Sequence, residues 1–224
     1  MKKDISELFI YIDDFCKQYQ LFFQTQTLPA MRKPTRIPGL TTSEIMTIVL
    51  LFHQSPAKNF KFFYKNYLQL YKSDFPNLPS YNRFIELQQQ CLGYFHALLM
   101  ILCAIAKHNG LSYLDSTPIP VCHNKRIYKH KVFNGLAAKS KSTMGWFFGF
   151  KLHLVINEKG ELLNAMLTPG NVDDRVPVRQ MTAKLTGVLY RSYVNGFIHI
   201  FSTLVAYVLK SKKPAIKLEN LIPN

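Results

Sequence analysis

The chain has 224 residues, of which 48% are hydrophobic and 13% aromatic, and it carries 28 Lys and Arg against 13 Asp and Glu. This length and apolar content allow one or two domains with a buried core and exclude a wholly disordered protein. The formal net charge of +15 favours a polyanionic partner, most simply nucleic acid, because cations that neutralise phosphates release bound counterions. An anionic membrane surface or a ribosome would also satisfy this charge.

The cysteines and the apolar segments predict a cytoplasmic protein with reduced thiols. Cys16, Cys91, Cys103 and Cys122 are widely spaced and form no C-x-x-C pair, so we expect neither a zinc site nor a disulfide framework. The N-terminus meets acidic residues at once and has no apolar signal core. Residues 197–209 come nearest to a membrane helix, but polar residues interrupt them, and we expect no membrane partner.

The first 108 residues predict an all-helical region. Residues 4–26 repeat apolar side chains at spacings of three and four, as in an amphipathic helix. Residues 29–40 contain prolines and basic side chains and predict an extended connection. Thr41 and Glu44 then have the spacing of a capping box at a helix start. Residues 80–107 predict another long helix.

Residues 58–72 interleave aromatic and lysine side chains. Aromatic rings among lysines can stack on bases while the lysines follow a phosphate backbone. The same pattern is typical of an ordinary helix whose aromatic side belongs to the core. On either interpretation we expect phosphate contacts from the lysines of this stretch. They are Lys58, Lys61 and Lys65.

The pattern changes to strands near residue 110. Residues 111–121 are strand-like up to Pro118 and Pro120, and residues 146–157 alternate apolar and polar side chains. A turn at 158–160 and a second strand at 162–167 complete a hairpin, and a helix follows at about 176–186.

These changes predict an α+β chain with three parts. Residues 1–109 form a helical domain, which we expect to bind DNA. Residues 110–190 form a domain with a β-hairpin sheet and helices. Residues 191–224 form a C-terminal helix and a basic tail.

Asp115 is the first candidate for chemistry. It lies in the apolar strand-like run, and no other acid follows it before Glu158. A carboxylate at a strand end beside a cationic segment suits a metal ion that acts on phosphates. A solvated turn with a capping Asp is the alternative. The basic residues that we expect to contact DNA in this region are Lys125, Arg126, Lys129, Lys131, Lys139, Lys141 and Lys151.

Asp173 and Asp174 are the other candidates. Two-metal phosphoryl transfer needs several carboxylates that converge on ions about 3.5–4 Å apart, which one Asp cannot supply. Glu158 and Glu161 lie at a predicted turn. An Asp-Asp pair before a helix more often supplies an N-cap and a first-turn charge than a metal ligand, and that interpretation stays open here.

Three segments carry a resemblance to a known family: Leu-Asp-Ser-Thr-Pro-Ile-Pro-Val-Cys at 114–122, Gly-Trp-Phe-Phe-Gly-Phe-Lys-Leu-His-Leu-Val-Ile-Asn at 145–157, and Thr-Pro-Gly-Asn-Val-Asp-Asp-Arg at 168–175. In sequence and order they resemble bacterial insertion-sequence DDE transposases, in particular the insertion sequence 982 family. The resemblance extends over nearly the whole chain.

The resemblance implies a ribonuclease-H-like core in which a first strand carries the first catalytic Asp and a hairpin follows it. By motif position that Asp, also a metal ligand, is Asp115. The implied activity is cleavage of double-stranded DNA at transposon ends and strand transfer, with Mg²⁺ or Mn²⁺ as cofactor. The implied setting is the bacterial nucleoid, with a homo-oligomer or a full-length transposase as a further partner.

The chain departs from this family after the hairpin. Residues 182–190 resemble a segment before the family's second Asp, whereas residues 191–195 resemble one after its Glu, and only Glu219 remains as a later acid. The core therefore looks internally deleted, and 110–190 would be a partial core. We expect no meaningful catalysis, and we expect the helix at 193–208 to cover part of the exposed sheet. The alternatives are a DNA-binding remnant that competes with a full-length transposase and a basic protein of a membrane or ribosome.

Overall fold

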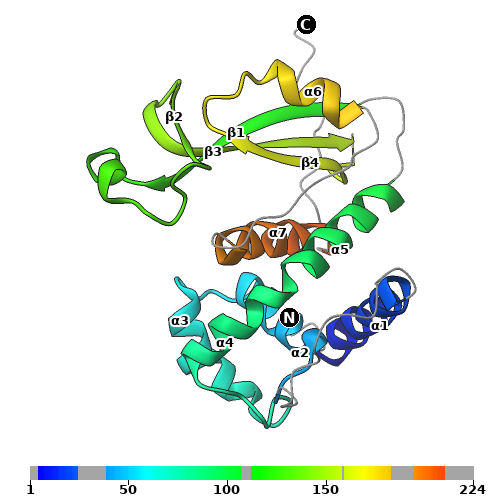
Figure 1. The fold of residues 1–224 in the computed structure, drawn as a ribbon. Helices are drawn as coiled ribbons and strands as arrows, with labels where there is room; N and C mark the ends of the chain where they lie inside the picture. The colour runs from blue at the N-terminus through cyan, green and yellow to red at the C-terminus, as the bar shows by residue number, and fades with distance from the viewer. Residues whose placement is uncertain (1–4, 25–38, 107–111, 158, 183–193, 210–224) are drawn as a thin grey trace, which may run out of the picture. The chain divides into compact units, whose positions relative to one another are not determined.

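A computed structural model describes residues 5–24, 39–106, 112–157, 159–182 and 194–209 of the chain (Figure 1). Helices and an antiparallel sheet make up these residues, so the predicted mixture of helix and sheet is confirmed. The chain divides into two compact units. The helical unit consists of Met1–Leu99 and Val194–Leu209, and the sheet unit consists of Met100–Tyr193 and Lys210–Asn224.

The helical unit begins with α1 (Ile5–Gln24) and α2 (Thr42–Gln54), and both predicted helices are confirmed. Thr41 and Glu44 form the predicted capping box: the Glu44 backbone N–H donates to Thr41 Oγ1 at 3.2 Å, and the Thr41 N–H donates to Glu44 Oε2 at 2.6 Å. These bonds satisfy two of the backbone donors that a helix start leaves without intrahelical partners. The predicted connection at 29–40 lies mostly outside the described residues.

The predicted helix at 80–107 is helical with one interruption. α4 (Tyr81–Gln88) passes through a 3-10 turn at Gln89–Cys91 into α5 (Leu92–Ile105). By length and composition, Tyr81–Ile105 is the one candidate membrane span within the described ranges, with 44% of its apolar window buried in the protein. Core helices of soluble proteins pass the same test, so this run is weak evidence for a membrane.

α7 (Val194–Val208) belongs to the helical unit. It packs against α2, where Thr203 Oγ1 lies 3.0 Å from His53 Nδ1. Leu204 and Val205 are buried. The helix that we expected to cover the sheet therefore contributes to the core of the helical unit, because its apolar side matches an apolar side of α2.

The sheet unit contains β1 (Ser112–Cys122), β2 (Ala138–Ser142), β3 (Gly145–Asn157) and β4 (Leu162–Pro169), all antiparallel. β3 is central: β1 pairs along one side of it, and β2 and β4 pair one after the other along the other side (Figure 1). The predicted strands at 146–157 and 162–167 are confirmed. β2 was not predicted, because its Ala, Lys and Ser side chains have little strand preference.

β1 continues through Pro118 and Pro120, so the prediction that this strand ends at its prolines is wrong. Pro118 faces Lys151 and Pro120 faces Gly149 in the register with β3. In the described part of the chain β1 pairs with β3 alone, which makes it an edge strand. An edge strand accepts proline where the missing N–H would point away from its partner.

Gly149 permits the close approach of β1 to β3. A Cβ at this position would collide with the backbone carbonyl oxygen of Ile119 and lie 3.0 Å from Pro120 Cα. The pairing of β1 and β3 is also irregular between Pro120 and Cys122. A glycine is therefore required where the proline-containing part of β1 crosses β3.

α6 (Arg175–Thr182) follows β4, and the predicted helix at 176–186 is confirmed as far as Thr182. Asn164 of β4 donates from Nδ2 to the Met181 carbonyl at 2.8 Å. This bond holds the helix beside the strand that precedes it. Residues 183–193, which include the proposed deletion junction, lie outside the described residues.

Candidate functional site

Asp115 lies in the middle of β1, opposite Leu154 of β3. Its side chain is exposed, and its Oδ1 accepts a hydrogen bond from the Ser116 backbone N–H at 2.8 Å. Directly paired residues of an antiparallel sheet share a face, so Asp115 lies on the same face as Leu154 and Ala165. At these directly paired positions Asp115 is the one carboxylate, beside the apolar side chains of Leu154 and Ala165.

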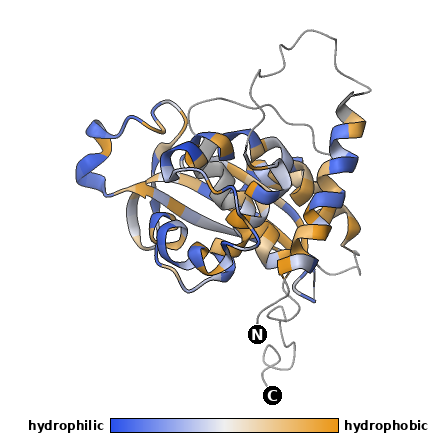
Figure 2. Cartoon of the chain, turned by 90° about the horizontal axis from the view of Figure 1, so that it is seen from below, coloured by the Kyte–Doolittle hydropathy of each residue, from blue (hydrophilic) through white to orange (hydrophobic). Residues whose placement is uncertain are grey.

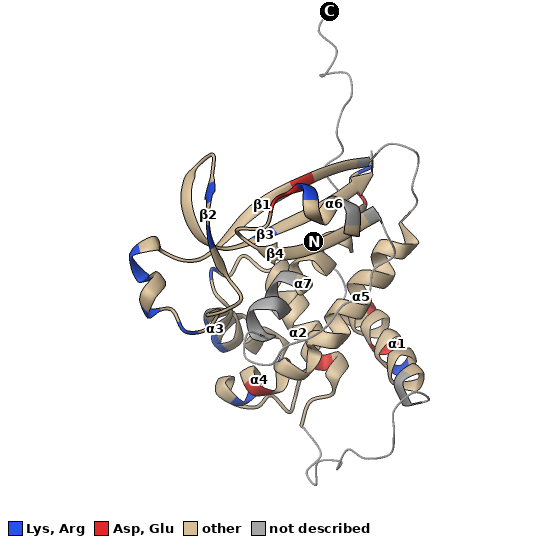
Figure 3. Ribbon diagram, turned by 45° about the horizontal axis from the view of Figure 1, so that its top comes forward, with Lys and Arg blue, Asp and Glu red and all other residues tan. Residues whose placement is uncertain are grey.

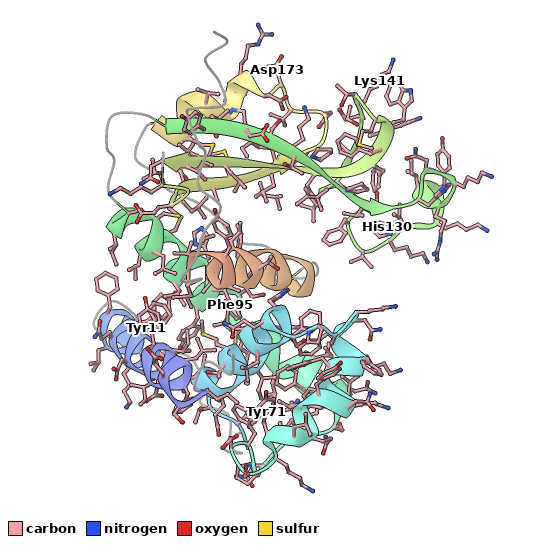
Figure 4. The ribbon with its side chains drawn as sticks, turned by 180° about the vertical axis from the view of Figure 1, so that it is seen from behind. Tyr11, Tyr71, Phe95, His130, Lys141 and Asp173 are labelled. Atoms are coloured by element: carbon pink, nitrogen blue, oxygen red, sulfur yellow. The ribbon has the colours of Figure 1, made fainter. Side chains whose placement is uncertain are left out.

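Asp173 is bound to the residue that starts α6. Its Oδ1 accepts from the Arg175 backbone N–H at 2.9 Å and from Arg175 Nε at 3.1 Å, and Arg175 Nη2 lies 2.9 Å from Oδ2. These hydrogen bonds from Arg175 hold the pKa of the Asp173 carboxyl well below its usual range. Figure 4 shows Asp173 beside α6. The geometry matches the helix-start interpretation.

Asp174 forms an ion pair with Lys151 of β3, with 2.9 Å between Asp174 Oδ1 and Lys151 Nζ. The same ammonium donates to the Val172 carbonyl at 3.0 Å, and the Lys151 side chain is only 16% exposed. Lys151, which we expected to contact DNA, is thus bound within the protein. Its ammonium ties the loop before α6 to the sheet.

The strand register separates Asp115 from this ion pair. Lys151 and His153 lie an odd number of residues from Leu154 along β3, so they belong to the face opposite Asp115. His153 is buried and its Nε2 lies 2.9 Å from Thr168 Oγ1. Burial lowers the pKa of His153. The carboxylates that the sequence suggested as one site are therefore divided between two faces.

The described residues do not fit a pair of catalytic metal ions. Within them no group of three or more His, Cys, Asp or Glu side chains could hold a metal. Asp115 offers a single carboxylate, while Asp173 and Asp174 each have a cationic partner. Two-metal chemistry needs carboxylates that converge on both ions. Glu161 accepts from Asn157 Nδ2 at 2.7 Å, and Glu158 lies outside the described residues.

Residues 123–146 form a basic arm, which contains the 3-10 helix Asn124–Lys129 and the β2–β3 hairpin tip. All its cationic side chains are exposed, and blue segments follow its ribbon in Figure 3. The cationic residues of the arm are Lys125, Arg126, Lys129, Lys131, Lys139 and Lys141.

Aromatic packing anchors the base of this basic arm. The ring centroids of His130 and Phe133 are 5.8 Å apart in a stacked pair, and Phe133 meets Phe150 of β3 edge-on at 5.4 Å. Asn124 Nδ2 donates to the Trp146 carbonyl at 2.6 Å. Figure 4 shows His130 and Lys141 on this part of the sheet unit. The arm presents its lysines on a scaffold tied to the sheet.

The second basic stretch lies in the helical unit. Lys58, Lys61 and Lys65 are exposed around α3 (Phe60–Phe62) and the π-helical turn Phe63–Tyr67. Most of the aromatic residues between them are buried in the core. Buried rings cannot stack on bases, so base stacking by this stretch is disfavoured. Those buried in the core are Phe60, Phe63 and Tyr64.

The sequence-based site missed Tyr128, Met144 and Trp146, which are exposed on the basic arm. A signal was present in Ala138–Ser142, where lysines alternate with small residues as in a half-exposed strand. Recognition of that strand would have paired it with β3 and placed Met144 at a hairpin tip.

Residues 105–210 match the family model described as "Transposase DDE domain". This range covers just under half of the chain and includes Asp115, the basic arm, Asp173 and Asp174. No curated protein and no solved structure matches the chain. The match confirms the predicted resemblance to DDE transposases and supports a transposase-type function. Transposases of this class act on DNA and generally use divalent metal ions.

Proposed function

We propose that this protein derives from a DDE transposase of the insertion sequence 982 family and binds double-stranded DNA at transposon ends. The observation that carries the proposal is the match of residues 105–210 to the transposase DDE domain. The basic arm of that region supplies cations for phosphates, and Lys58, Lys61 and Lys65 supply more from the helical unit. In a bacterial cell the protein would lie on the nucleoid.

The sheet supports a partial ribonuclease-H-like core. β1 carries Asp115, and the β3–β4 hairpin follows it, in the order that the family resemblance implies. The outer edge of β1 has no strand partner in the described part of the chain. A missing second half of the core would leave that edge open, which agrees with the proposed internal deletion.

We further propose that the chain has no meaningful transposase catalysis. Asp115 is the first catalytic Asp by motif position, and Asp173 and Asp174 would have to supply its partners. Both are bound to cations, and the register places the Lys151–Asp174 pair with the face opposite Asp115. For Asp173 or Asp174 to serve as a metal ligand, Mg²⁺ or Mn²⁺ would have to compete with the Arg175 and Lys151 cations.

The same observations favour a second function, a non-catalytic remnant that occupies transposon ends and competes with a full-length transposase. The exposed lysines would still bind DNA. The chain would not cleave it, because Asp115 and Asp174 lie with opposite faces of the sheet. The further partner in this proposal is a second copy of the chain or the full-length enzyme, and a mixed oligomer with that enzyme would strengthen the competition.

A nicking and strand-transfer assay on a transposon-end duplex tests the catalytic part of the proposal. The protein is compared with Asp115→Asn and with the Asp173→Asn/Asp174→Asn double variant in Mg²⁺ and in Mn²⁺. We expect salt-dependent binding by all three and no turnover by any of them. Cleavage by the native chain that disappears in Asp115→Asn would contradict the proposed loss of activity. If the double variant also lost cleavage, Asp173 or Asp174 would be the replacement metal ligand.

Competition is tested by adding the protein to a full-length transposase of this family on the same duplex. We expect strand transfer to fall as the protein is added, and to recover when more of the transposon-end duplex is supplied. A matched duplex without the end sequence serves as control, because only base readout distinguishes it. Equal inhibition relieved equally by both duplexes would reduce the function to non-specific DNA binding.

A further inference from the structure

Three large side chains of the basic arm are exposed to an unusual degree. Tyr128 is 99% exposed, Met144 is 95% exposed and Trp146 is 56% exposed. Single exposed apolar residues are normal on protein surfaces. Here the three lie on one arm that contains only positive charges, and Figure 2 shows hydrophobic segments within its hydrophilic ribbon.

The arm holds these side chains in defined places. Tyr128 lies in the 3-10 helix Asn124–Lys129, and Met144 lies at the tip of the β2–β3 hairpin, which Gly145 closes with a φ of +111°. The Asn124–Trp146 hydrogen bond of 2.6 Å joins the 3-10 helix to the start of β3. The backbone that carries Tyr128 is therefore tied directly to Trp146.

Packing of the arm depends on other aromatic residues. His130 and Phe133 form the stacked pair at its base, and they contact Phe148 and Phe150 of β3. The Trp146 ring instead carries the Lys139 ammonium at 5.1 Å from its centroid, a cation–π contact at an exposed site. Trp146 thus presents a ring and a cation together to the solvent, and the exposed Tyr128 ring lies between Arg126 and Lys129 in the sequence.

We propose that Tyr128 and Trp146 are base-stacking residues and that the basic arm binds DNA containing unpaired bases. This inference rests on the proposed DNA-binding function and names the form of DNA that the arm prefers. Bases within an intact duplex already stack on one another, so an exposed ring gains most from a base that has left the stack. Lysines beside the rings neutralise the phosphates that flank such a base.

Trp146 is the only tryptophan of the chain, so its fluorescence reports directly on the arm. The full chain is titrated with oligothymidylate and with a fully paired duplex of equal length, and labelled DNA gives the affinity independently by anisotropy. We expect tighter binding of oligothymidylate and stronger quenching of Trp146 by it. Tyr128→Ala should weaken oligothymidylate binding about 10-fold, while Tyr128→Phe should keep it, since stacking needs only the ring.

Two control variants distinguish the effect of base stacking from the effect of charge and from the effect of removing any exposed apolar side chain. Lys125→Gln should lower the affinity for both DNAs and reduce the slope of log affinity against log salt by about 1. Leu70→Ala removes a 75% exposed apolar side chain from the helical unit and should change neither affinity. Unchanged circular dichroism shows that each variant is folded.

Equal affinity for paired and unpaired DNA, together with no effect of Tyr128→Ala, would overturn the stacking inference and leave the proposed function standing. Absence of binding to either DNA would overturn both. Tighter binding of oligouridylate than of oligothymidylate would overturn the assignment of DNA in favour of RNA.

Discussion

The helical unit and the sheet unit differ in how completely they bury large side chains. Among the described residues, the largest fully buried side chains include Phe63, Phe84 and Phe95 of the helical unit, whereas Leu162 alone represents the sheet unit. The helical unit thus has a closed core of aromatic and aliphatic residues. The sheet unit has few such residues, although it contains most of the region that matches the transposase domain.

The faces and edges of the sheet explain this difference. α6 lies beside β4, and His153 on that face of the sheet is buried, whereas Asp115 on the opposite face is exposed, as is Leu114 on β1. β1 is an edge strand within the described ranges, and an open edge limits the apolar area that a sheet removes from water. The unit that carries the basic arm is therefore the less completely packed one.

The largest effect is expected from Phe95→Ala in the core of the helical unit. Phe95 of α5 is fully buried and lies within the helical unit in Figure 4. Loss of a buried Phe side chain costs about 3–5 kcal/mol, because contacts disappear and a cavity remains. Urea unfolding followed by helical circular dichroism should show this loss, while Trp146 fluorescence follows the sheet unit separately. Equal shifts of both signals would mean that the two units unfold as one.

An intermediate effect is expected from Gly149→Ala in the sheet unit. The new Cβ would meet the Ile119 carbonyl oxygen, and relief requires movement of β1 away from β3. Overpacking of this kind costs about 1–3 kcal/mol. The Trp146 fluorescence transition should move to lower urea while the helical signal stays close to its original midpoint. Thr143→Ala in the exposed hairpin turn is the matched control, and a neutral result for Gly149→Ala would show that β1 is not held closely against β3.

The smallest effect concerns pH and His153. Burial lowers the pKa of His153 in the folded protein, so its neutral form stabilises the fold above the ordinary histidine pKa of about 6.5. As pH falls below that value, the unfolded chain takes up a proton that the folded chain resists, and stability decreases. Unfolding midpoints from Trp146 fluorescence, measured between about pH 7.5 and about pH 5, should fall more for the native chain than for His153→Gln. Parallel curves for the two proteins would show that His153 does not cause the decrease.

Local sequence patterns predicted the helices and the central hairpin well. α1 and the Thr41 capping box follow from periodicity and from one Thr–Glu spacing, and β3 and β4 follow from alternation. Each of these signals depends on hydrogen bonds and side-chain directions within a few residues. Predictions failed where the environment overrode local preference, as in β1, where an edge position accepts two prolines.

The chemistry of the site depended on distant contacts that local patterns do not encode. Composition and motifs alone led to a basic, transposase-like chain with Asp115, Asp173 and Asp174 as its candidate acids. Strand register then placed Asp115 on the face opposite Lys151, which neutralises Asp174, and folding of the arm exposed Tyr128. A shift of one residue in register would exchange the two faces, and short-range preferences carry too little free energy to choose between such pairings.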